Sequence, residues 1–254
     1  RIICGSFYWK KDNKIVISII IPTYNEARNI TGLVMRIKAC LFAEYELIIV
    51  DDASPDGTGA IAEKLGPIHP IKVVHRDKKL GLASAVLEGV KAACGDLLCV
   101  MDSDLSHPPE IIPLLIKDLE LQCADIIIAS RFIKGSGIEN WPKIRLWGTN
   151  LAMLAVRPLT PVKDPMSGFF ILKTNVLHNA NLIPRGFKIL LEILVKGKYK
   201  KAVEFPFVFK DRVYGSSKLN SRTYLDFIEQ LFDLYLYKLK NVLLKSSDRH
   251  DFLK

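Results

Sequence analysis

The feature that most constrains the fold is an alternation of strand-like and helix-like runs in the first 130 residues. Apolar runs at 15–21, 46–51, 97–101 and 125–130 are almost uninterrupted, and a fifth at 71–75 is less so. Uninterrupted apolar strands are typical of parallel sheets that are covered on both faces. Helix-like stretches separate them, at about 26–40, 57–65, 83–93 and 109–121. The alternation predicts an α/β protein with a doubly wound, mostly parallel sheet.

The alternation ends after residue 131. There we expect a helix at 144–156, an edge hairpin or strand within 164–173, a helix at 187–196, a strand at 202–209 and an apolar-striped helix at 223–244. We therefore divide the chain into an extension (1–14), a main domain (15–222) and an amphipathic helix with a tail (223–254). The final helix either lies on a membrane surface or packs on the sheet, and the pattern alone leaves both open.

The chain of 254 residues carries a net charge of +9, and the excess is local. Residues 181–254 contain 15 basic and 8 acidic side chains, which favours an anionic partner there or a solvated basic surface. We find no signal-peptide pattern in these residues, and charges interrupt the apolar tracts before the ~20 residues of a membrane span. The five cysteines and five histidines lack metal-ligand spacing, so we interpret them as reduced thiols and structural histidines.

Polar clusters follow several of the predicted strands. They are PTYNE (22–26), DDASPDGT (51–58), DSD (102–104) and Arg131. The carboxyl ends of parallel strands meet at one edge of a sheet, where ligands bind in such folds. The clusters therefore predict a binding cleft at this edge.

Asp102 and Asp104 end an apolar strand one residue apart. In an extended backbone, residues i and i+2 point to the same side, so the two carboxylates would repel each other without a cation. A few hard oxygen ligands suit Mg²⁺ or Mn²⁺, which complete their shell with water and substrate phosphates. The alternative, an acidic capping turn before PPE, explains one aspartate but does not need both.

The predicted sheet lacks the usual phosphate loops of nucleotide-binding proteins. No G-x-G-x-x-G follows the first strand, and no GxxxxGK[ST] occurs. Asp51 and Asp52 end the second strand, where an acidic residue typically meets a ribose or base donor group. A nucleotide held here would need its diphosphate neutralised by a metal and by basic side chains.

Several of these motifs, together with others along the chain, resemble those of a known family. PTYNE, VDDASPDGT, GLASA, MDSDLSHPPE, SR (130–131), DPMSGF and RVYGSSK resemble the inverting family 2 glycosyltransferases over about 15–240. MDSDLSHPPE and RVYGSSK narrow the resemblance to dolichyl-phosphate mannosyltransferases. The resemblance implies a GT-A-like nucleotide-sugar fold, with 15–222 as the catalytic domain. It also implies transfer of mannose from GDP-mannose to dolichyl or polyprenyl phosphate with inversion.

Carried over by position, the resemblance assigns roles to individual residues. It implies a nucleotide-sugar site of Pro22, Tyr24, Glu26, Val50, Asp52, Ser103, Arg212 and Lys218, and a catalytic set of Asp102, Asp104 and Arg131. The metal ligands would be Asp102, Asp104 and Ser106. Many relatives have Gln at the position of Ser106, and serine is a poorer ligand. Arg145 and Thr149 would bind the acceptor phosphate.

The acceptor chemistry determines whether a base is needed. A sugar hydroxyl must lose a proton as it attacks, whereas a polyprenyl phosphate oxygen is already anionic near neutral pH. We therefore expect no protein general base. Asp164 would be the candidate base for a hydroxyl acceptor, and otherwise we expect Asp164→Asn to cost little activity.

The resemblance also implies a location and partners. We expect a peripheral protein on the cytoplasmic face of a membrane, the endoplasmic reticulum in a eukaryote or the plasma membrane in a prokaryote, with small membrane-anchoring subunits as further partners and no nucleic acid. One alternative is a polyprenyl-phosphate glucosyltransferase that uses UDP-glucose. The alternative of another class is a basic membrane- or nucleic-acid-binding module, for which KGKYKK (196–201) is the only aromatic-interleaved basic stretch.

Overall fold

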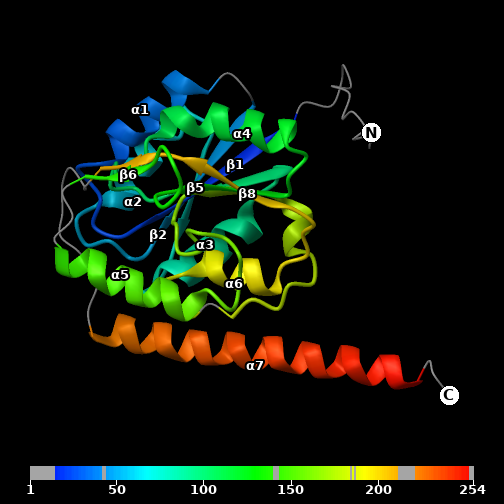
Figure 1. The fold of residues 1–254 in the computed structure, drawn as a ribbon. Coiled ribbons are helices and arrows are strands. Elements are labelled where there is room, and N and C mark those ends of the chain that lie inside the picture. Colours follow the sequence, from blue (N-terminus) through cyan, green and yellow to red (C-terminus); the bar gives the residue numbers. More distant parts are fainter. Residues whose placement is uncertain are drawn as a thin grey trace.

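A computed structural model describes residues 15–41, 44–139, 143–183, 185, 187–210 and 221–251. A central sheet lies between two layers of helices, and a pair of helices forms a further layer at one side (Figure 1). The expected α/β class and doubly wound sheet are confirmed.

The main sheet has seven strands in the order β3-β2-β1-β4-β7-β5-β8. Their bounds are β1 Ile17–Thr23, β2 Tyr45–Asp51, β3 Ile71–His75, β4 Leu97–Val100, β5 Ile126–Ser130, β7 Phe170–Lys173 and β8 Ala202–Pro206. All the pairings are parallel except those of β7 with β4 and β5. Two short strands, β6 (Gly137–Ile138) and β9 (Val208–Phe209), form a separate parallel pair.

Helices cover both faces of the sheet. One face carries α1 (Ile30–Cys40), α2 (Thr58–Leu65) and α4 (Ile112–Leu121), the last preceded by the 3₁₀ turn Pro109–Ile111. The other face carries α3 (Leu82–Ala92) and α6 (Ile189–Lys196), with the 3₁₀ turn Thr174–Leu177 after β7. The side chains of β1 alternate between the two cores, so the apolar run of this strand is buried on both sides.

Strand β7 corrects one sequence-based expectation. Residues 164–173 were expected at an edge of the sheet, but β7 lies inside it, between β4 and β5. Its residues Phe170, Ile171 and Leu172 are buried, as expected for a central strand that is covered on both faces. Because β7 is antiparallel, its amino end lies at the carboxyl edge of β4 and β5.

Other differences are smaller. The strand expected at 202–209 is divided into β8 and β9, and α1 begins at Ile30 because the four residues before it form a turn.

Cys40, Cys94 and Cys99 are free thiols, but Cys123 is disulfide-bonded, so the prediction of reduced cysteines is wrong at that position.

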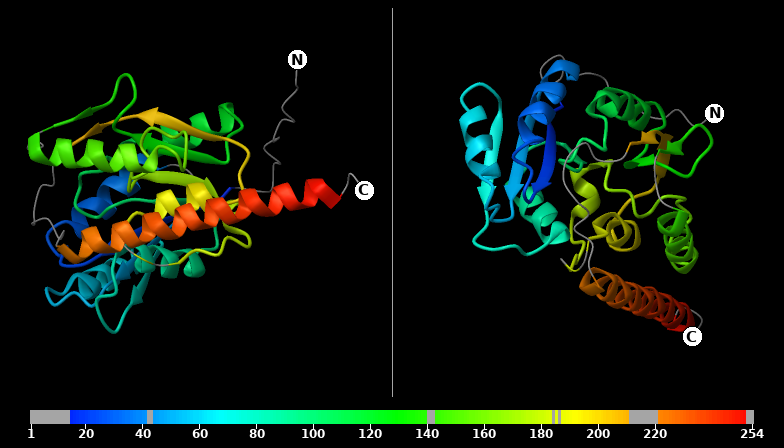
Figure 2. Two further views of the ribbon diagram at one scale, coloured as in Figure 1. Left: turned by 60° about the horizontal axis from the view of Figure 1, so that its bottom comes forward. Right: turned by 90° about the vertical axis from the view of Figure 1, so that its left-hand side faces the viewer.

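Two helices, α5 (Lys143–Val156) and α7 (Ser221–Asp251), lie side by side outside the α3/α6 layer (Figure 1, Figure 2). The Tyr235 hydroxyl donates to the Ala155 carbonyl at 2.6 Å, and Lys238 Nζ donates to the Pro158 carbonyl at 2.6 Å. A small apolar cluster around Leu234, which is 1% exposed, joins α7 to α5 and α6. Within the described residues, no helix has the length and apolar character needed to cross a bilayer.

Candidate active site

The loops after β1 and β2 are joined at the carboxyl edge of the sheet. The backbone N–H of Glu26 donates to Thr58 Oγ1 at 2.9 Å, and that of Ala27 donates to Asp56 Oδ2 at 3.0 Å. Thr58 Oγ1 in turn donates to Asp56 Oδ1 at 2.6 Å. Much of the polar cluster 51–58 therefore holds the PTYNE loop in place.

Asp52 is 4% exposed, and its carboxylate holds a neighbouring loop. It accepts the backbone N–H of Leu80 at 3.0 Å and of Gly81 at 2.9 Å, and it lies 3.1 Å from Nη1 of Arg76. The family resemblance implies that Asp52 contacts the nucleotide. The structure shows that both of its oxygens bind the loop 76–81 and thereby fix that loop beside the site.

The other nucleotide candidates lie along the same edge. Tyr24 is half-buried, and Lys79 Nζ lies 3.9 Å from the centre of its ring. Glu26 is 6% exposed and accepts a hydrogen bond from Asn29 Nδ2 at 2.7 Å. The Val50 side chain is fully buried in the core, so this residue can face a ligand only with its backbone.

The acidic loop after β4 has a strained turn. Leu105 has φ +64°, a left-handed conformation that is unfavourable for a bulky side chain and is found at functional sites. Ser103 Oγ donates to the Pro22 carbonyl at 3.3 Å, and Ser106 donates to Asp104 Oδ1 from both Oγ (2.6 Å) and N (3.1 Å). These hydrogen bonds hold the loop in one conformation and fix the position of the Asp104 carboxylate within it.

The donor set of this loop fits a hard divalent cation. Asp102 and Asp104 provide carboxylate oxygens, and Ser106 provides a hydroxyl beside Asp104. In the part of the chain that the structure describes, no three His, Cys, Asp or Glu side chains gather as a protein-only metal cage. Two carboxylates suit a cation that takes its other ligands from water and substrate phosphates.

Arg131 and Asp164 form a buried bidentate ion pair. Arg131 Nε and Nη2 each lie 2.8 Å from a different oxygen of Asp164, and the Arg131 backbone N–H donates to Oδ2 at 3.0 Å. The Asp164 side chain is fully buried and that of Arg131 is 10% exposed. This carboxylate neutralises a buried guanidinium, so Asp164 has a structural role in addition to its place in the loop before β7.

The remaining assigned residues lie on other elements. Thr149 is half-buried on α5, not on the loops of the carboxyl edge. The side chain of Arg145, together with Arg212 and Lys218, lies outside the described residues.

The structure gives contacts to residues that had no individual role in the sequence-based assignments. Arg76 anchors Asp52, and Thr58 and Asp56 hold the first loop, as the Asp-x-Thr spacing of a capping turn could have indicated. His107 and Gly168 both contact Asp102, and only the strand register brings Gly168 there.

Known proteins resemble this chain over most of its length. The sequence model of glycosyl transferase family 2 matches residues 18–180. The chain is 46% identical over 223 residues to "Dolichol-phosphate mannosyltransferase" of Pyrococcus furiosus, covering 86% of this chain and 63% of the relative. It is 38% identical over 235 residues to the protein of the same name from Saccharomyces cerevisiae, covering 87% of each. The chain thus spans less than two thirds of the archaeal relative and most of the yeast one.

Solved structures share the fold. A mannosyltransferase from Pyrobaculum calidifontis, in complex with GDP-Man and Mn²⁺, superposes with a TM-score of 0.60 at 19% identity, covering 91% of this chain and 65% of that one. At this identity the likeness shows the fold alone, which is the GT-A fold of glycosyltransferases.

The Arg131–Asp164 pair yields a stability prediction. Asp164→Asn leaves a buried guanidinium without its counter-charge, so we expect the free energy of unfolding to fall by about 3–5 kcal/mol. The control is Glu110→Gln, which removes the partner of the exposed Arg36 and should cost about 1 kcal/mol or less. Urea denaturation measures both, and equal losses in the two variants would contradict the structural role of Asp164.

Proposed function

This chain belongs to glycosyl transferase family 2, and we propose that it transfers mannose from GDP-mannose to dolichyl or polyprenyl phosphate with inversion. The observation that carries the proposal is the identity of 46% and 38% with two proteins named dolichol-phosphate mannosyltransferase. A neighbour of the same fold binds GDP-Man. The names favour this reaction over the UDP-glucose alternative and over a binding module without activity.

The proposal includes a divalent cation, Mg²⁺ or Mn²⁺. Asp102 and Asp104 would hold it, with the Ser106 hydroxyl beside Asp104. When bound, such an ion acts as a Lewis acid that neutralises the charge on the departing nucleoside diphosphate. The oxygen donors of the loop and the Mn²⁺ in the fold neighbour support this assignment.

The bonding of Asp164 supports transfer without a protein base. A general base must have an oxygen placed to take a proton from the acceptor. Both oxygens of Asp164 bind Arg131, and the carboxylate is fully buried. A phosphate acceptor needs no proton removed, so the task of the chain is to position the acceptor and neutralise charge. In this proposal Arg131, Arg145 and Thr149 perform that task.

An apolar surface on α5 and α7 supports a peripheral location at a membrane. Trp147 is 70% exposed and Leu154 63% on α5. The exposed apolar side chains of α7 are Tyr224, Leu225, Ile228, Phe232, Tyr235, Leu236 and Leu239. The two helices lie together at one side of the molecule (Figure 1), so their exposed side chains can enter one lipid surface. The cytoplasmic face, and small anchoring subunits as partners, remain part of the proposal.

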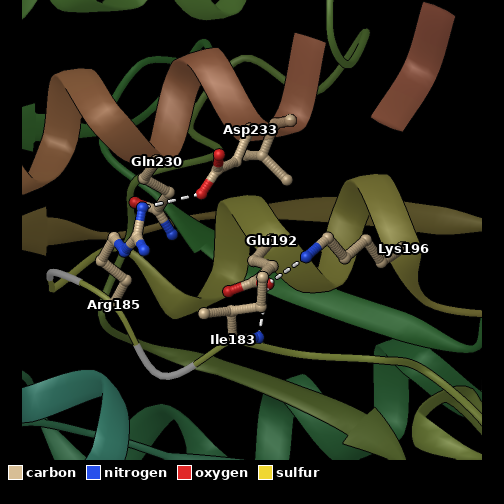
Figure 3. Close-up of a pocket in the computed structure, with 7 residues that line it drawn as sticks. Ile183, Arg185, Glu192, Lys196, Gln230 and Asp233 are labelled. Carbon is tan, nitrogen blue, oxygen red and sulfur yellow. Dashed lines mark hydrogen bonds and ion pairs between the residues drawn. The ribbon is translucent and has the colours of Figure 1, made fainter. Parts of the chain in front are cut away.

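Helix α7 also packs on the body of the protein, so the proposed lipid contact concerns only its exposed face. A small pocket between α6 and α7 is lined mostly by polar side chains, together with Ile183 and Leu234 (Figure 3). Lys196 Nζ lies 2.6 Å from Glu192 Oε1, and Arg185 Nη1 lies 2.9 Å from Asp233 Oδ2. Deleting the whole helix would expose these groups. A membrane test must therefore change surface side chains only.

The membrane surface can be tested with the double variant Trp147→Ser/Phe232→Ser. Each buried apolar side chain contributes about 1.5–3 kcal/mol on leaving water, so we expect binding to anionic phospholipid vesicles to weaken by at least about tenfold in co-sedimentation. The control is Leu121→Ser/Ile68→Ser, which changes side chains that are 72% and 66% exposed elsewhere. Equal binding of the two double variants would contradict the proposed surface.

The donor is tested with thermal shifts of the full chain. Ligands that bind only the folded state raise Tm, so GDP-mannose with Mn²⁺ should raise it, and UDP-glucose with Mn²⁺ should not. Asp104→Ala should lose the part of the GDP-mannose shift that depends on Mn²⁺ and retain the part seen in EDTA. A larger shift with UDP-glucose would reverse the donor assignment, and a full Mn²⁺-dependent shift in Asp104→Ala would contradict the metal site.

A further inference from the structure

His107 has no role in the proposed reaction, yet it is 3% exposed and directly follows the acidic loop. The backbone N–H of Asp102 donates to His107 Nδ1 at 3.0 Å. An imidazole nitrogen that accepts a hydrogen bond carries no proton. With Nδ1 as the acceptor, the ring N–H lies on Nε2.

The protonated nitrogen faces the side chain of the same aspartate. His107 Nε2 lies 3.8 Å from Asp102 Oδ2. The imidazole therefore contacts both the main chain and the carboxylate side of one residue. At 3.8 Å the contact of Nε2 with the carboxylate is too long for a hydrogen bond, so the bond from the Asp102 main chain to Nδ1 is the stronger constraint on Asp102.

The ring itself is held by aromatic packing. His107 stacks on Phe169, with ring centres 5.1 Å apart and planes at 20°. The rings of Phe207 and Phe209 meet it edge-on at 6.1 and 6.0 Å. These contacts restrict rotation of the imidazole about its side-chain bonds, so the orientation of Nε2 is set before any ligand binds.

Gly168 provides the space that this arrangement needs. The antiparallel register pairs Val100 with Phe170, which places Gly168 opposite Asp102 two residues further along. A Cβ at position 168 would lie 3.2 Å from Asp102 Oδ2 and 3.2 Å from His107 Cε1. Any side chain there would press on both groups.

We propose that His107 is a positioning residue for the metal site: its Nδ1 holds the Asp102 main chain and its ring lies beside the Asp102 carboxylate, in a space that Gly168 leaves open. This inference rests on the proposed function, since it takes Asp102 as a metal ligand. Partners of this kind, which orient a ligand without touching the metal, typically change metal affinity by 10–100-fold.

The test compares His107→Phe with His107→Asn in the full chain. Phenylalanine keeps the aromatic packing but has no acceptor for the Asp102 N–H, whereas the Asn amide oxygen can replace Nδ1. With GDP present, we expect the Kd of Mn²⁺, measured by the electron paramagnetic resonance of free Mn²⁺, to rise about 10–100-fold in His107→Phe. It should rise less in His107→Asn. Affinity for GDP in EDTA should be unchanged in both variants.

Controls separate positioning from folding and from the proposed function. His178→Phe makes the same change at an exposed histidine and should leave the Kd of Mn²⁺ unchanged. If His107→Phe does not fold, Gly168→Ala gives the same test from the other side of Asp102, with the same expected rise. In addition, ¹⁵N NMR of the wild-type imidazole should show the tautomer protonated on Nε2.

The outcomes are distinguishable. Three results would overturn the positioning role alone. The first is an unchanged Kd of Mn²⁺ in folded His107→Phe, and the second is a loss of GDP affinity in EDTA as large as the loss of Mn²⁺ affinity. The third is an imidazole protonated on Nδ1. If His107→Phe is unfolded, an unchanged Kd in Gly168→Ala would overturn it in the same way. A wild-type protein that binds no Mn²⁺ in the presence of GDP would overturn the proposed metal site, and the inference with it.

Discussion

The site depends on one topological constraint, the insertion of antiparallel β7 between β4 and β5. Parallel strands bring only their carboxyl ends to the active edge. An antiparallel strand in their midst brings its amino end there, so the loop before β7 lies beside the loops after β4 and β5. Asp164 thereby meets Arg131 after β5, and Gly168 meets Asp102 after β4. The register of this one short strand therefore brings together two pairs of residues that are distant in the sequence.

Buried charge at this edge is tolerated because each group has a specific partner. Asp164 binds Arg131 with both oxygens, and Asp52 binds Arg76 and two backbone N–H groups. Ion pairs of this kind add little net stability over an apolar core, but loss of one partner is costly. Their effect here is geometric. They hold the loops of the edge in fixed positions, as a site for a dianionic diphosphate and its cation requires.

The sequence predicted the parts of the fold that depend on local pattern. The first five strands, and most helices, have apolar runs or helical spacing that can be read without tertiary contacts. The position of β7 could not be read in this way, because an isolated FFIL run is equally consistent with an edge strand. Asp52 shows the same limit for the site. The sequence shows an acidic residue at the end of a strand, but the partners of Asp52 are Arg76, Leu80 and Gly81, on a loop beyond the next strand. The contact of His107 with Asp102 likewise depends on a turn around Leu105, whose left-handed backbone no composition rule predicts.

The central claim is that the chain transfers mannose to a phosphate oxygen without a protein base. Radiolabelled GDP-mannose and Mn²⁺ should be supplied with dolichyl phosphate in one reaction and with dolichol, which has a hydroxyl in place of the phosphate, in another. The account predicts labelled β-mannosyl phosphate from dolichyl phosphate and no transfer to dolichol. Transfer to the alcohol, or no product from dolichyl phosphate with the protein folded and GDP-mannose bound, would contradict it.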